Sequence, residues 1–261
     1  MTDPISNWAE PDRLWAGSGE AIFSVLPQTI LTNFFSPRSE NALLWNLIYP
    51  RAQPSLSLQA LLALEPSWGT ADLGVDREEA LIPYYWGYRL DGMRLDGLDG
   101  VLTEIDGKGP QTEVDLFLLG EHTLISVESK RSSTFGRCAR YAARRCPEIH
   151  DTNQDEDVSC RYWEPGPARF SEQLQLGPRP TPESDAIPCN VHYQLARTYL
   201  VGGTLARRLG RNHAMWIFMP RKRWRALEST WLDFVDRVGD DHAWRWMRAI
   251  AWEQIRNLPI Y

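Results

Sequence analysis

The chain has 261 residues, a length typical of one large domain or of one domain with a sizeable insertion. Hydrophobic residues make up 43% and charged residues 24% of the sequence, which excludes a wholly disordered or fibrous protein. No run approaches the ~18 consecutive apolar residues of a membrane span, and the acidic start, Met1-Thr2-Asp3-Pro4, lacks the basic and apolar regions of a signal peptide. We therefore expect a cytoplasmic protein that does not engage a membrane.

The net charge of −6 conceals an asymmetry between the two halves of the sequence. Residues 1–130 carry 8 Lys and Arg against 19 Asp and Glu, a net of −11, whereas residues 131–261 carry 20 against 15, a net of +5. This division fits an enzyme that holds a metal at one place and a polyanion at another, and it fits ordinary drift of surface charge equally well. Only three of the 28 basic residues are lysines, so Lys130, one of the three, draws attention.

The predicted elements begin after an irregular segment over residues 1–37. An amphipathic helix is expected over residues 39–48, ended by Pro50, and a second helix over Leu56–Leu64. Residues 66–100 show no clear periodicity.

Three strands are expected next, over Val101–Asp106, Thr112–Leu119 and Thr123–Lys130, with a turn at Gly120-Glu121 between the last two. An irregular insertion is expected over residues 131–190, followed by a helix over residues 191–209 and an apolar strand over residues 215–219. Two further helices are expected over residues 229–238 and 241–258. This order predicts a single domain over residues 1–261, of the α/β or α+β class, built around a small mixed sheet.

Charged side chains are expected to share one face of the predicted hairpin. Because side chains alternate along a strand, Glu128 and Lys130 point the same way, and so do Glu113 and Asp115. A two-residue turn places Glu113 opposite Glu128 with Asp115 diagonal to it, whereas a three-residue turn would move one strand's set to the other face. Three crowded carboxylates are tolerable where a divalent cation neutralises them. The alternative is a solvent-exposed charged face in which Glu128 and Lys130 pair.

Asp115, followed by Glu128-Ser129-Lys130 at the end of the next strand, resembles the core motif of the PD-(D/E)XK nuclease superfamily, although Val114 stands where the family usually has proline. Its restriction-endonuclease-like fold comprises a helix, three antiparallel strands, a helix and a further strand, which agrees with the predicted order over about residues 38–219. The resemblance implies that Asp115 and Glu128 ligate Mg²⁺ (or Mn²⁺) and that Lys130 positions or activates the attacking water.

Two helices extend the resemblance. The helix that begins at Ser39 is similar to the leading helix of some bacterial restriction-endonuclease-like families, which implies that Glu40 lends a carboxylate to the metal, where the family pattern has Gln. The helix that contains Gln194 is similar to the Gln-and-Tyr helix of RecB-like and CRISPR-adaptation nucleases. Because Gln194 and Tyr199 are five residues apart rather than four, only Gln194 is matched to the family pattern. Glu113 is expected as a further carboxylate of the catalytic patch.

These residues predict a metal-dependent nuclease that hydrolyses phosphodiester bonds, with DNA as the first choice of substrate. The rival is a catalytically silent nucleic-acid-binding or assembly module on the same fold, which need not keep Asp115, Glu128 and Lys130 together. A third class, an unrelated metal-dependent phosphoesterase, ordinarily has His-rich ligand motifs that this sequence lacks. Assembly into a homodimer or a larger complex stays open.

The cysteines and a basic segment complete the candidate residues. Zinc is bound by four Cys or His ligands, and it would staple a segment without its own core. The candidate ligands are Cys138, Cys146, Cys160 and Cys189, with His150 in reserve; the alternative is that these cysteines are small buried hydrophobic residues. The basic and aromatic run Arg221-Lys222-Arg223-Trp224-Arg225 is typical of contacts with phosphates and bases. By contrast, Trp231, Trp244 and Trp252 are expected on the core faces of helices.

Overall fold

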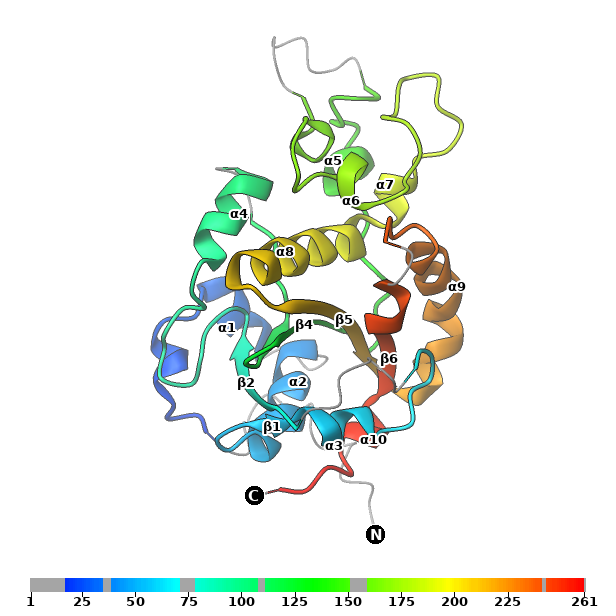
Figure 1. Ribbon diagram of the computed structural model, residues 1–261. Helices are drawn as coiled ribbons and strands as arrows, with labels where there is room; N and C mark the ends of the chain where they lie inside the picture. The colour runs from blue at the N-terminus through cyan, green and yellow to red at the C-terminus, as the bar shows by residue number, and fades with distance from the viewer. Residues whose placement is uncertain are drawn as a thin grey trace.

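The fold is a mixed α/β arrangement around a curled six-stranded sheet (Figure 1). The computed structural model describes residues 17–34, 39–70, 78–107, 111–150, 159–240 and 243–260. The strands follow one another across the sheet in sequence order: β1 (Leu56–Ser57), β2 (Ala80–Tyr85), β3 (Leu116–Leu119), β4 (Thr123–Ser129), β5 (Asn212–Met219) and β6 (Met247–Ala251).

The direction of the strands changes at β4. Strands β1 to β4 are antiparallel neighbours, whereas β5 runs parallel to β4, and β6 runs parallel to β5. A parallel neighbour requires a crossover connection, and α8 (Tyr193–Leu209) lies in the crossover from β4 to β5. The carboxyl ends of β4 and β5 therefore meet at one edge of the sheet, beside the start of β3.

Helices cover both faces of the sheet (Figure 1). On one face, α8 packs with alternate strand residues such as Leu124, Met215 and Ile217. The opposite face, with Val127 among its residues, is covered by α2 (Glu40–Ile48). All seven residues of β4 are buried, as expected for a strand covered on both sides.

The remaining helices are mostly short. In chain order they are η2 (Ala21–Ser24), α1 (Gln28–Phe34), η3 (Tyr49–Arg51), α3 (Leu58–Leu62), α4 (Leu98–Asp106), α5 (Ala139–Ala142), η4 (Arg161–Trp163), α6 (Phe170–Gln173), α7 (Pro188–Val191), η5 (Arg221–Arg223), α9 (Trp224–Val235), η6 (Ala243–Trp246) and α10 (Trp252–Ile255). Within the described part of the chain, none of the helices is both long and apolar enough to cross a membrane.

The strand expected over Val101–Asp106 is wrong, because these residues belong to helix α4. Its buried residues, Leu98, Val101, Leu102 and Ile105, follow the helical repeat rather than the alternation of a strand. Gly107, with a φ of +74°, is the C-cap of this helix. The antiparallel neighbour of β3 is instead β2, from the region without clear periodicity.

The long helix expected over Asp241–Leu258 is also wrong, because strand β6 interrupts it. Arg248 lies in this strand and is fully buried, and its guanidinium donates to the carbonyl oxygens of Leu61 at 3.1 Å and Leu64 at 2.8 Å. Because Arg248 is charged, it interrupts the apolar run by which a buried strand such as β6 is normally predicted. Trp231 and Trp252 are buried as predicted, whereas Trp244 is 45% exposed.

The segment over residues 131–190 consists of loops and the short helices α5, η4, α6 and α7, and it lies beyond α8 in Figure 1. We expected this segment to stand apart from the core. In the structure, Tyr162, Trp163 and Phe170 are buried in the hydrophobic cluster that includes residues of α8. The segment therefore contributes to the main core.

Candidate active site

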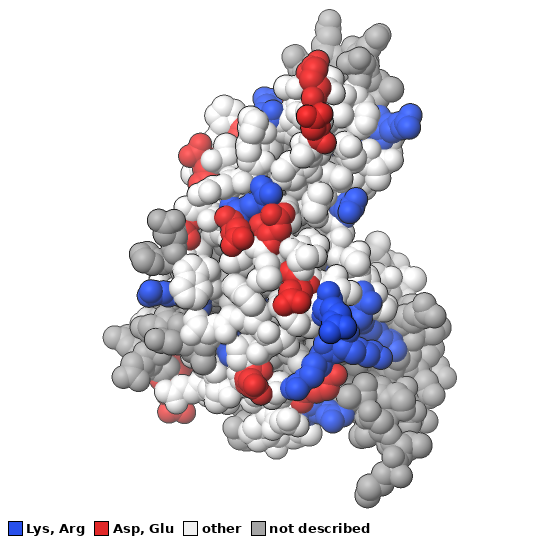
Figure 2. Space-filling view, turned by 90° about the vertical axis from the view of Figure 1, so that its right-hand side faces the viewer, with Lys and Arg blue, Asp and Glu red and all other residues white. Residues whose placement is uncertain are grey.

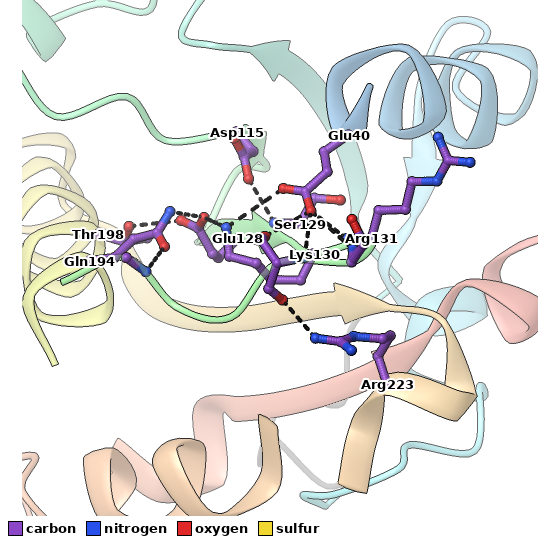
Figure 3. Close-up of polar contacts among 12 residues, drawn as sticks. Glu40, Asp115, Glu128, Ser129, Lys130, Arg131, Gln194, Thr198 and Arg223 are labelled. Atoms are coloured by element: carbon purple, nitrogen blue, oxygen red, sulfur yellow. Dashed lines mark hydrogen bonds and ion pairs between the residues drawn. The ribbon is translucent and has the colours of Figure 1, made fainter. Parts of the chain in front are cut away.

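The predicted motif residues meet at one edge of the sheet (Figure 3). Leu116 pairs with Val127, so Asp115, which directly precedes β3, lies one position further along, across from Glu128. The turn is longer than predicted, because Leu119 pairs with Leu124 rather than with His122. A shift of two residues preserves the face, so Asp115 takes the place opposite Glu128 that we predicted for Glu113.

Glu128 is the centre of the cluster, and its side chain is fully buried. Its Oε1 atom accepts a hydrogen bond from Lys130 Nζ at 2.6 Å and another from Gln194 Nε2. Thr198 Oγ1 donates to the other oxygen, Oε2, at 3.2 Å. A buried carboxylate is costly unless it is paired and hydrogen-bonded, and these three donors supply that compensation.

Lys130 is 4% exposed and is surrounded by carboxylates. Its Nζ atom lies 2.6 Å from Glu128 Oε1 and 3.9 Å from Glu40 Oε2. Burial lowers the pKa of Lys130, but the charges of Glu128, Asp115 and Glu40 outweigh it and raise the pKa above its ordinary value. The side chain therefore remains a fixed ammonium group at neutral pH.

Asp115 is held in a charged environment that disfavours its ionised form. One carboxylate oxygen, Oδ2, accepts a hydrogen bond from the backbone N–H of Ser129 at 2.7 Å. Burial and the facing charge of Glu128 raise the pKa of Asp115 well above its ordinary value, although Lys130 and the Ser129 hydrogen bond act against this shift. A positive ion between the two carboxylates would relieve this repulsion.

Glu40 reaches the site from the start of α2, which Ser39 caps by accepting a hydrogen bond from the N–H of Ala42 at 2.9 Å. Glu40 Oε1 accepts hydrogen bonds from the N–H of Arg131 at 2.7 Å and from Ser133 Oγ at 2.8 Å. Burial raises the pKa of Glu40, but Lys130 and these hydrogen bonds lower it overall. Glu40 therefore holds residues 131–133, which directly follow Lys130, in place.

Gln194 and Thr198 approach Glu128 from one face of α8 (Figure 3). Gln194 Oε1 accepts from the N–H of Gly136 at 2.6 Å, so its Nε2 group is turned toward Glu128. We did not predict a role for Thr198. It lies four residues after Gln194, where helical spacing puts two side chains on one face, so this spacing was the signal available in the sequence.

Glu113 is the exception among the predicted catalytic residues. It is exposed and lines a cavity of about 270 Å³ whose other lining residues include Trp86, Tyr88 and Arg94. Although the residue is exposed, partial burial of its carboxyl group raises the pKa of Glu113, and Arg197 opposes this shift. The structure therefore places Glu113 away from the Glu128 carboxylate, two residues before Asp115.

The basic segment predicted to bind nucleic acid lies next to the motif. The Arg223 guanidinium donates to the carbonyl oxygen of Ser133 at 3.1 Å, three residues after Lys130 (Figure 3). Arg221, Lys222 and Arg225 are exposed. Figure 2 shows basic side chains gathered on the side of the molecule where α9 lies in Figure 1, with acidic side chains beside them.

The described residues contain no group of three or more His, Cys, Asp and Glu side chains already arranged to hold a metal ion. The four cysteines are free thiols: Cys138, Cys146, Cys160 and Cys189. Cys146 is buried, and the other three are partly buried. The reserve zinc candidate, His150, accepts a hydrogen bond at Nδ1 from the N–H of Cys146 at 3.2 Å.

Comparisons with known proteins identify no relative of this chain. No protein-family model matches the chain, and neither a curated protein nor a solved structure matches it.

Proposed function

We propose that this protein is a Mg²⁺-dependent nuclease that hydrolyses phosphodiester bonds of DNA. The observation that carries the proposal is the meeting of Asp115, Glu128 and Lys130 at one edge of the sheet, with Glu40 and Gln194 directed at them from helices on its two faces. The order α2, β2 to β4, α8 and β5 supports a restriction-endonuclease-like core, with α4 inserted between β2 and β3.

The donor set suits a hard divalent cation. Carboxylate oxygens are the ligands that Mg²⁺ prefers, and Asp115, Glu128 and Glu40 are the residues that would hold it. Burial and the facing charge of Glu128 raise the pKa of Asp115, and a cation would remove the second of these two causes. When bound, Mg²⁺ stabilises charge on the phosphate and lowers the pKa of a bound water.

The remaining residues of the cluster orient these groups. Gln194 and Thr198 fix the plane of the Glu128 carboxylate, and Glu128 in turn holds the Lys130 ammonium group. With its three N–H donors, Lys130 is suited to orient the attacking water and to stabilise negative charge on the phosphate. The exposed residues Arg221, Lys222 and Arg225 would then hold the neighbouring phosphates of the strand.

A cleavage assay tests this proposal. Single- and double-stranded DNA and RNA are incubated with the protein in Mg²⁺, in Mn²⁺ and in chelator. We expect cleavage of DNA in either metal and none in chelator. Binding of DNA without cleavage in any metal would contradict the proposal and would leave the silent nucleic-acid-binding module as the function. Cleavage that persists in chelator would exclude the metal mechanism.

A further inference from the structure

The fold brings together four cysteines that are far apart in the sequence. The backbone N–H of Cys138 donates to Asn190 Oδ1 at 3.2 Å, and Asn190 directly follows Cys189. The N–H of Cys160 donates to Glu148 Oε1 at 2.8 Å, and Glu148 lies two residues after Cys146. Two pairs of neighbours result: Cys138 with Cys189, and Cys146 with Cys160.

The two pairs also lie close to each other. The thiol of Cys189 interacts electrostatically with those of Cys146 and Cys138, and the thiol of Cys160 interacts with those of Cys189 and Cys146. The thiols of Cys138 and Cys146 interact in the same way, so each of the four thiols lies within electrostatic range of at least two of the others.

We propose that Cys138, Cys146, Cys160 and Cys189 bind one structural zinc ion. Zinc prefers four ligands in a tetrahedron and accepts four cysteine thiolates. The sulfurs are not yet arranged as ligands, so binding must draw them together, and zinc binding is commonly coupled to such local ordering. His150 is not among the proposed ligands, because its Nδ1 atom accepts from the N–H of Cys146 and the neutral ring then carries its proton on Nε2, which leaves neither nitrogen with a free lone pair.

The segment has a physical need for such an ion. Helices η4 and α6 are held by the main core, but α5 has no buried residue and α7 buries only Asn190, and helices of four residues do not persist without external support. The segment also carries Gly136, which lies two residues before Cys138 and whose N–H holds the side chain of Gln194. A zinc ion would therefore steady a contact next to Glu128 without taking part in the chemistry.

Metal analysis of the 261-residue protein, purified without added metal, is the first test. We expect about one zinc per chain, and we expect the four thiols to react with a thiol reagent only after a strong chelator is added. Replacement of zinc by Co²⁺ should produce the charge-transfer and visible bands of a tetrahedral thiolate site. Protein without metal and with four freely reactive thiols would overturn the proposal, as would disulfides or stoichiometric iron.

Three variants test which residues bind the zinc ion. Cys160→Ser should lose most of the bound metal, whereas His150→Ala should keep one zinc per chain and the same cobalt spectrum. Glu128→Gln, outside the cysteine cluster, should also keep the zinc, which separates this proposal from the proposed nuclease activity. If Cys160→Ser fails to fold, the thiol reactivity and cobalt spectrum of the wild-type protein decide. Loss of zinc in His150→Ala with retention in Cys160→Ser would overturn the assignment.

Discussion

At the residue scale, the Glu128–Lys130 ion pair is both a buried structural contact and part of the proposed catalytic cluster. It is almost completely buried, so each charge depends on the other for compensation, yet both groups stand where the proposed chemistry requires them. Removal of one partner of a buried ion pair leaves an uncompensated charge, which typically costs roughly 3–5 kcal/mol.

We expect Lys130→Met to lower the free energy of unfolding by roughly 3 kcal/mol or more, because Glu128 is then left buried with only neutral donors. The double variant Glu128→Gln/Lys130→Met should recover much of this loss. Urea unfolding followed by circular dichroism measures both. Equal destabilisation of the single and the double variants would show that the pair is not coupled.

Asp115→Asn should have the opposite effect on stability. The variant removes the repulsion from Glu128 while its side-chain oxygen can still accept from the N–H of Ser129, so the melting temperature in chelator should rise. Mg²⁺ should raise the melting temperature of the wild-type protein and leave that of Asp115→Asn nearly unchanged. Thermal melts with and without Mg²⁺ check both statements, and a wild-type protein that does not respond to Mg²⁺ would contradict the metal site.

His213 supplies a pH-dependent contribution away from the candidate site. Its Nε2 atom lies 2.9 Å from Ser126 Oγ, and burial lowers the pKa of His213 from 6.5 to about 3. Between these two values the unfolded chain binds a proton that the folded chain does not. The stability is therefore fully present above pH 6.5 and is lost as the pH falls, by at most about 1.4 kcal/mol per pH unit.

We expect the free energy of unfolding of the wild-type protein to fall between pH 7 and pH 5 more steeply than that of His213→Gln. Carboxylates with ordinary pKa values contribute little over this interval, so the difference between the two slopes isolates the histidine. Equilibrium unfolding at several pH values provides both slopes. Parallel curves would mean that His213 is protonated equally well in the folded chain.

At the element scale, η5 and the first turn of α9 carry the groups that we propose to bind the phosphates of the substrate, with Arg221 and Lys222 in η5 and Arg225 in α9. Reversal of charge at Arg221, Lys222 and Arg225 should weaken DNA binding for all sequences alike and lower the salt slope by about one unit per lost contact. Arg223 is left intact because it holds the carbonyl oxygen of Ser133.

Fluorescence anisotropy at several salt concentrations measures the affinity and the slope. Arg211→Glu serves as the control: Arg211 directly precedes β5, at the edge of the sheet opposite the candidate site, and changes the charge by the same amount per residue. An unchanged dissociation constant in the triple variant, or an equal loss per residue in the control, would place the DNA elsewhere.

Local patterns predicted some elements and not others. The hairpin of β3 and β4 was predictable, because its apolar residues and turn are close in sequence. Strand β2 was not, because Pro83 stands in its middle, where a strand prediction normally fails. Strand β6 was not predicted for a related reason, since the partners of Arg248 come from α3 and the residues just after it, far away in the sequence.

The candidate site was predictable only in part. Asp115, Glu128 and Lys130 share a face whenever the register shifts by an even number of residues, so their meeting tolerated a turn longer by two residues but not one longer by a single residue. Helical spacing puts Thr198 on the face of α8 that carries Gln194, but the contact of this face with Glu128, and the separation of Glu113 from the cluster, depend on where α8 and the start of β3 are placed. Such placement follows from tertiary packing and cannot be derived from local spacing.

At the scale of the whole molecule, the site lies where the acidic and basic halves of the sequence meet. Glu40, Asp115 and Glu128 come from residues 1–130, whereas the basic segment over η5 and the start of α9 comes from residues 131–261. The two are adjacent because β4 and β5 run parallel and end at the same edge of the sheet. This junction suits a metal-dependent enzyme that acts on a polyanion.

The most direct test of this account is the single-turnover rate of DNA cleavage in Mg²⁺, measured for the wild-type protein, Glu128→Gln and Glu113→Gln. Both variants remove one carboxylate charge, but only Glu128 belongs to the cluster with Lys130. We predict that Glu128→Gln lowers the rate at least ~100-fold, in line with loss of a catalytic electrostatic group, and that Glu113→Gln stays within a few-fold of wild type. Cleavage by Glu128→Gln at the wild-type rate would contradict the account.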